Sequence, residues 1–202
     1  MARRARRAFP NSTTKTARDR CRSWRSAAGR RWCAAGVVDA LPAAPLHLIR
    51  ARDCADEPWR NGAGRTRTLW SGEGARISVA VLECDAPFSA YAGYDRTFCL
   101  LGPDAVTLTV DGAERVLAPG QWTSFAGEAA VAVRLEGGPV RALNVMTARG
   151  LARHAVQRAA GPVEGALLVA LAGDGPRYDA GDLIVPPYPS GLAGSFLAVR
   201  IS

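Results

Sequence analysis

Apolar and polar residues alternate with a period of two through much of the chain between residues 65 and 147. Such alternation places apolar side chains on one face of a strand and polar side chains on the other. In residues 76–82, Ile77, Val79 and Val81 share one face, which we expect to be a core face, whereas the opposite face is small and polar. The pattern predicts an all-β body, with further strands at residues 66–70, 97–101, 106–110, 131–135 and 142–146.

Turn residues separate these segments at short intervals. Asp111-Gly112, between the segments 106–110 and 114–117, is the clearest hairpin signal, because this dipeptide favours a two-residue turn. After Gly150 the alternation weakens, and it resumes in three final segments that we expect to return to the same sheets. These lie at residues 166–171, 182–185 and 195–199. Short strands separated by turns are typical of an antiparallel β-barrel or sandwich.

Charge divides the chain into two parts. Residues 1–45 hold 11 of the 26 lysines and arginines but only two of the 18 acidic residues, whereas residues 46–202 hold 15 basic and 16 acidic residues. We interpret 1–45 as a disordered, basic N-terminal tail and 46–202 as a single domain. The tail's composition also resembles an organelle transit peptide and would suit a nonspecific nucleic-acid arm. The body itself is not basic, so we expect no nucleic-acid binding outside the tail.

Cysteine, histidine and hydropathy limit the chemistry and the location. The five cysteines are odd in number and form no C-x-x-C pair, and we expect Cys84 and Cys99 to lie in strands as free, small apolar residues of a reducing cytoplasm. His47 and His154 have no second ligand-type residue at metal spacing, so we predict no metal site and no cofactor. No apolar run is long enough for a membrane span.

Two segments could form a ligand site. Trp59-Arg60-Asn61-Gly62 opens a glycine-rich turn whose backbone N–H groups could cradle an anion, although a plain connecting turn is also consistent. Phe88 lies in an aromatic segment that leads to Asp95-Arg96 at the start of an apolar strand. A guanidinium held there by a neighbouring acid would suit a carboxylate ligand; the alternative is a structural ion pair.

Asn144 stands in the middle of a predicted strand, where its amide must bond a neighbouring loop or face a cavity. We therefore predict no catalytic residue and a binding site whose members supply a carboxylate clamp, amide contacts and apolar walls. The set is Arg96, Asn61, Trp59, Arg76, Phe88 and Asn144.

Five blocks of sequence together resemble the HutD/Ves family. They are Trp-Arg-Asn-Gly-x-Gly-x-Thr at 59–66, Arg-Ile-Ser-Val-Ala at 76–80, Pro-Phe-Ser with Gly-Tyr-Asp-Arg-Thr at 87–97, Phe-x-Gly at 125–127 and Gly-Pro-x-x-x-x-Asn-Val-Met-Thr-x-Arg at 138–149. The resemblance covers roughly residues 46–200. It implies a cupin-like antiparallel β-barrel without the cupin metal-binding histidines. It also implies a regulator associated with histidine utilisation, with urocanate or formylated glutamate derivatives as candidate ligands.

The chain departs from that family pattern at two positions. Ala63 stands where the family usually has a glycine, which a negative φ would tolerate. Ala142 stands where an acidic residue normally precedes Leu143-Asn144, so a carboxylate that could orient Arg76, Arg96 or Arg141 is missing.

The sequence is compatible with two functions. The first is a metal-free, small-molecule-binding cupin whose partner is a small anionic metabolite; a homodimer is compatible with it. The alternative is a metal-independent isomerase or hydrolase acting on a small carboxylate metabolite, with Asp95, Glu83 or Tyr94 as candidates for proton transfer. The scarcity of histidine favours binding over catalysis.

Overall fold

The computed structural model describes residues 46–59, 62–175 and 177–202, and it is built from strands and one single-turn 3-10 helix, η2 (Ala51–Asp53). All strand pairs in its three sheets are antiparallel. The predicted all-β fold is therefore confirmed. The predicted tail, residues 1–45, lies outside the described residues.

Three sheets make up the body. The central sheet has the order β2-β3-β4-β11-β6-β9, with β2 (Asp56–Pro58), β3 (Gly64–Gly72), β4 (Ala75–Leu82), β11 (Val140–Ala148), β6 (Tyr94–Gly102) and β9 (Trp122–Ala126). The four-stranded sheet has the order β5-β10-β7-β8, with β5 (Ala86–Pro87), β10 (Val131–Leu135), β7 (Val106–Val110) and β8 (Ala113–Leu117). The five-stranded sheet has the order β1-β14-β13-β15-β12, with β1 (His47–Ile49), β14 (Leu183–Val185), β13 (Leu167–Ala170), β15 (Phe196–Ile201) and β12 (His154–Ala159).

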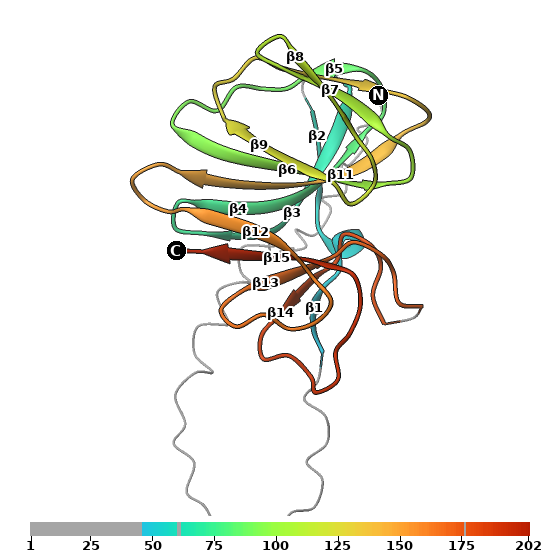
Figure 1. Cartoon of the computed structure of the whole chain (residues 1–202), viewed down its shortest axis with the longest axis vertical. Coiled ribbons are helices and arrows are strands. Elements are labelled where there is room, and N and C mark those ends of the chain that lie inside the picture. The colour runs from blue at the N-terminus through green and yellow to red at the C-terminus, as the bar shows by residue number, and fades with distance from the viewer. Residues whose placement is uncertain (1–45, 60–61, 176) are drawn as a thin grey trace, which may run out of the picture. The chain divides into compact units, whose positions relative to one another are not determined.

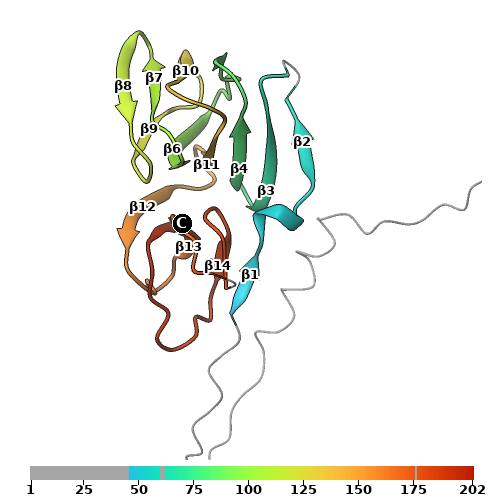
Figure 2. The same ribbon diagram turned by 90° about the vertical axis from the view of Figure 1, so that its right-hand side faces the viewer.

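The central sheet lies between the other two, as Figure 1 shows, and Figure 2 shows the five-stranded sheet below the other two sheets. Phe98 and Leu100 of β6 pack with the four-stranded sheet in one core cluster, whereas Cys99 and Leu101 pack with the five-stranded sheet in another. The second face of residues 76–82 holds Arg76, Ser78 and Ala80, and it is covered as well. Ser78 and Ala80 are buried and Arg76 is half-buried, because the four-stranded sheet packs over this face.

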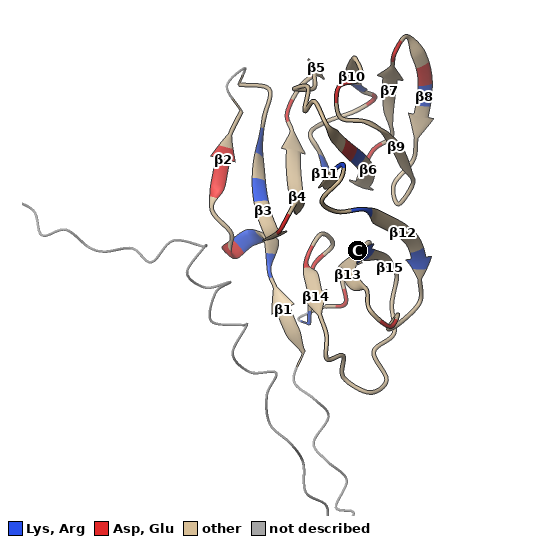
Figure 3. Cartoon of the chain, turned by 90° about the vertical axis from the view of Figure 1, so that its left-hand side faces the viewer, with Lys and Arg blue, Asp and Glu red and all other residues tan. Residues whose placement is uncertain are grey.

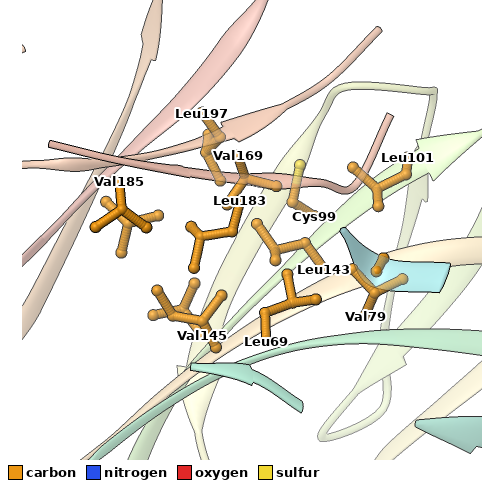
Figure 4. Close-up of a cluster of buried hydrophobic side chains, with 13 residues drawn as sticks. Leu69, Val79, Cys99, Leu101, Leu143, Val145, Val169, Leu183, Val185 and Leu197 are labelled. Atoms are coloured by element: carbon orange, nitrogen blue, oxygen red, sulfur yellow. The ribbon is translucent and has the colours of Figure 1, made fainter. Parts of the chain in front are cut away.

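We expected the last strands to return to the same sheets as the earlier strands, but they do not. They form the five-stranded sheet with β1 and β12, and this sheet is apolar on both faces. Val169 and Leu183 point into the cluster shared with the central sheet (Figure 4), whereas Leu168 and Ile184 join a separate cluster with Tyr178. Without the five-stranded sheet this apolar face of the central sheet would be exposed to solvent, and a single barrel would not supply the cover.

The predicted hairpin is confirmed. β7 pairs with β8 through Asp111-Gly112, and both residues have positive φ, at 48° and 84°. Two such residues make a type I′ turn, whose twist matches that of the flanking strands.

The two cysteines that we expected in strands differ. Cys99 is buried, and its burial raises the pKa of the thiol to about 12. Cys84 is exposed, contrary to our expectation, because β4 ends at Leu82 and Cys84 falls in the link to β5.

Paired charges line the outer edge of the central sheet. Figure 3 shows acidic residues on β2 beside basic residues on β3. Asp56 lies 3.2 Å from Arg67 and 3.6 Å from Arg65, and the hydrogen bond from Arg67 lowers the pKa of Asp56. Charged side chains on an edge strand discourage pairing with another chain.

His154 ties β12 to the central sheet. Its Nε2 lies 2.8 Å from the hydroxyl of Thr97 on β6, and its Nδ1 lies 2.8 Å from the hydroxyl of Thr147 on β11. Both threonines are buried. Burial lowers the pKa of His154 below its ordinary value of 6.5, although the negative charge of Asp95 opposes this shift. The imidazole is therefore neutral at pH 7.

We expect His154 to make stability depend on pH. Its proton binds more weakly in the folded than in the unfolded state, so its stabilising effect is present above pH 6.5 and declines as the pH falls through the lowered pKa. Urea unfolding from pH 7 to about pH 5 should show a steeper loss of stability for the wild type than for His154→Gln. Parallel pH dependences for the two proteins would contradict this prediction.

Candidate functional site

Arg96 points into the space between the central and four-stranded sheets. It lies two residues before Phe98 on β6, so the two side chains share a face, and Phe98 belongs to the cluster with the four-stranded sheet. Arg96 is only 7% exposed. The sequence of this strand places a charged side chain at the end of an otherwise apolar row.

The described contacts of the Arg96 guanidinium are neutral. Its Nε and Nη2 donate to Oδ1 of Asn144 on β11, at 3.0 and 2.7 Å. Its Cζ lies 4.5 Å from the centre of the Phe88 ring and 5.6 Å from that of Phe125. Burial, with a smaller contribution from the positive charge of Arg76, lowers the pKa of Arg96 to about 10, although Tyr91 opposes this shift. The group stays charged at neutral pH, at a cost in solvation.

Our expectation that a neighbouring acid holds Arg96 is wrong. Asp95 points to the other face of the strand, where it lies 2.8 Å from Arg149. Arg149 also pairs with Glu128 at 2.7 Å, and the hydrogen bond from Arg149 lowers the pKa of Glu128 to about 2. The acid next to Arg96 in sequence is thus engaged elsewhere, and Asn144 orients the guanidinium.

Arg76 adds a second positive charge on the same face. Met146 of β11 lies opposite Arg76 of β4 on one side and opposite Arg96 of β6 on the other. The Arg76 Nη2 lies 3.7 Å from the Met146 sulfur, and its Cζ lies 5.8 Å from the centre of the Tyr91 ring. Arg76, Met146 and Tyr91 line a pocket of about 210 Å³ together with Tyr94, Gly72, Gly74 and Ala75.

An aromatic wall adjoins Arg96. Trp59 donates its indole N–H to the Thr66 hydroxyl at 2.7 Å and meets Phe88 edge to face, with ring centres 6.4 Å apart. Phe88 in turn lies 5.5 Å from Phe98. The structure therefore brings together Arg96, Asn144, Phe88 and Trp59, with Arg76 beside them across Met146.

Three other positions that the sequence singled out are Asn61, Ala63 and Ala142. Asn61 lies outside the described residues. Ala63 is buried, and its φ lies outside the left-handed region, as the chain's departure from the family glycine requires. Ala142 lies between Ala80 and Leu100 in the buried cluster, where it supplies no carboxylate to the arginines.

Sequence reasoning missed Ser78 and Tyr91. Ser78 is buried on β4 directly opposite Asn144, and period-two alternation alone places it on the face of Arg76. Tyr91 lies in the loop before β6, held by a hydrogen bond from its N–H to the Gly127 carbonyl. No pattern in the sequence predicts the path of that loop.

In the described part of the chain, no three histidine, cysteine or acidic side chains cluster as metal ligands would. A helix long and apolar enough to cross a membrane is likewise not found in that part. The arrangement instead offers two guanidinium groups, an amide and aromatic walls, a set that can bind and orient a planar anion.

Comparisons with known proteins agree with this architecture. The HutD family model matches residues 51–173. An uncharacterised 21.2 kDa protein in the hutC 3′ region of Pseudomonas putida is 40% identical over 111 residues, which cover 51% of this chain and 58% of that protein. The chain thus matches less than two thirds of this curated relative's length.

Two solved structures are similar over most of the chain. HutD from Pseudomonas fluorescens SBW25, in a formate condition, has a TM-score of 0.66 at 26% identity, covering 78% of this chain and 98% of the other. A conserved protein of unknown function from Pseudomonas aeruginosa PAO1 has a TM-score of 0.62 at 28% identity, with the same coverage.

Proposed function

Since this chain belongs to the HutD family, we propose that it is a cupin-like protein of histidine utilisation that binds a small anionic catabolite at Arg96. Urocanate and formylated glutamate derivatives are the candidate ligands. The hutC 3′ region of the Pseudomonas putida relative supports the association with this pathway.

The observation that carries the proposal is the buried, charged Arg96, whose described contacts are the amide oxygen of Asn144 and two aromatic rings. A desolvated cation is costly without a counter-charge. A ligand carboxylate would supply that charge and could accept two hydrogen bonds from the planar guanidinium. Arg76 beside it increases the preference for an anion.

The two candidate ligands would use the site differently. Urocanate is a planar monocarboxylate, whose ring could stack on the aromatic wall of Phe88 and Trp59 while its carboxylate meets Arg96. Formylglutamate is a dicarboxylate, which could engage Arg96 and Arg76 together.

Titration calorimetry of the full chain with urocanate and with N-formylglutamate tests the proposal. We expect saturable binding of at least one of them, and no binding of histamine, which carries a positive charge and no carboxylate. An Arg76→Ala variant should weaken N-formylglutamate more than urocanate. Absence of binding by both acids at millimolar concentration would refute the proposal.

A further inference from the structure

A larger cleft lies where β6 and β9 of the central sheet face β12. It measures about 820 Å³, and Trp122, Ser124, Arg153 and His154 contribute to its lining, as do Arg96 and Phe125 of the ligand site. Ser124 lies opposite Thr97, and Trp122 lies opposite Cys99, whose side chain faces the five-stranded sheet. The side chains of Thr97 and Ser124 therefore point away from the face that Arg96 uses.

A continuous chain of hydrogen bonds reaches this cleft from the interior. The Ser124 hydroxyl lies 2.7 Å from that of Thr97, which lies 2.8 Å from Nε2 of His154, whose Nδ1 lies 2.8 Å from the Thr147 hydroxyl. One consistent proton arrangement has Ser124 donating to Thr97, Thr97 donating to Nε2, and Nδ1–H donating to Thr147. The inner hydroxyls are buried, whereas Ser124 is exposed.

A purely structural role explains only part of this hydrogen-bond network. The bonds of His154 to Thr97 and Thr147 join β12 to the central sheet, and they would do so whatever residue stood at position 124. Ser124 extends the network to an exposed hydroxyl on the cleft wall. An activated nucleophile needs a base that can take its proton and a third group that orients the base. Here the Thr97 hydroxyl connects Ser124 to the neutral imidazole of His154, and Thr147 orients that imidazole.

We propose that this cleft is a second functional site, in which His154 activates Ser124 through Thr97 for acyl transfer from a small ester that carries a carboxylate. Arg153 precedes His154 and its exposed side chain lies at the cleft, where it would hold the substrate carboxylate. Trp122 supplies an apolar surface for the acyl group.

The proton path balances at each step. As the Ser124 oxygen bonds to the acyl carbon, its proton passes to Thr97, and the proton of Thr97 passes to His154. When the ester C–O bond breaks, Thr97 gives a proton to the leaving alkoxide and regains one from His154. Water then repeats the sequence on the acyl-serine, so that ester and water yield acid and alcohol.

Acylation of the full chain by p-nitrophenyl acetate tests this proposal, with the site mapped by peptide mass spectrometry. We expect one acetyl group on Ser124, which Ser124→Ala removes and the exposed matched control Ser190→Ala leaves in place. Thr97→Val should slow acylation by about a hundredfold, and Thr97→Ser should restore it, because only the latter keeps the hydroxyl. The restored rate distinguishes proton transfer from packing.

Two results would overturn the proposal. One is acetylation elsewhere with Ser124 unmodified. The other is an equal rate in wild type and Thr97→Val, since a hydroxyl outside the proton path would be dispensable. Neither result would refute ligand binding at Arg96, because Arg96 and Thr97 are neighbours on β6 and their side chains point to opposite faces of the strand.

Discussion

Arg96→Met is expected to lose ligand binding, with the affinity for the carboxylate ligand falling at least about thirtyfold. Removing one partner of a buried, hydrogen-bonded charge pair costs about 2–5 kcal/mol in binding. The same substitution should lower stability by about 1–3 kcal/mol, because it leaves the Asn144 oxygen without the two hydrogen bonds it now accepts. Calorimetry and urea unfolding measure the two effects separately.

The double variant Arg96→Met/Asn144→Leu separates binding from folding. It replaces both polar partners by apolar groups, so we expect it to recover the stability lost by the single variant and not the affinity. Arg134→Ala, an exposed arginine on β10 that pairs with Glu136, is the matched control and should bind normally. Undiminished affinity in Arg96→Met would remove Arg96 from the site.

The solvation cost of burying the charged Arg96 guanidinium is consistent with a site selected for binding. A chain optimised for stability alone would place an apolar side chain beside Phe98, Phe88 and Phe125. The structure instead holds a guanidinium there through one amide. A ligand that neutralises this charge would also stabilise the folded chain.

The strands could be predicted from the sequence because period-two alternation is a local property. Residues 106–110, 131–135 and 142–146 all fall within strands as expected. The third layer could not be predicted in this way. The continuous apolar run of residues 98–101 indicates burial on both faces, yet which segment covers each face depends on contacts between distant parts of the chain.

The ligand site at Arg96 was partly predictable, because period-two alternation is a local property of the sequence. Alternation places Arg96 on the face of Phe98, and the mid-strand Asn144 required a hydrogen-bond partner. That these two residues meet depends on the register of β6 against β11, which no local pattern encodes. Sequence neighbours suggested Asp95 instead, although adjacent strand residues point to opposite faces.

β6 presents one face to each of the two proposed sites. Arg96 faces the aromatic wall on one side, and Thr97 faces His154 on the other. Substitutions at these neighbouring positions should affect different functions, because the two side chains point to opposite faces of the strand.

Leu143→Ala is expected to destabilise the fold by about 2–5 kcal/mol, as large-to-small changes in a core do. Leu143 is 0% exposed and lies on the face of β11 that the five-stranded sheet covers, among the side chains of Figure 4. Leu108→Ala, on β7 in the other cluster, should cost a similar amount, whereas Val116→Ala, 64% exposed on β8, should change stability by less than about 0.5 kcal/mol. Urea unfolding measures all three. If Leu143→Ala resembled Val116→Ala while Leu108→Ala remained costly, the five-stranded sheet would not cover the central sheet, and the cleft beside β12 would lose its second wall.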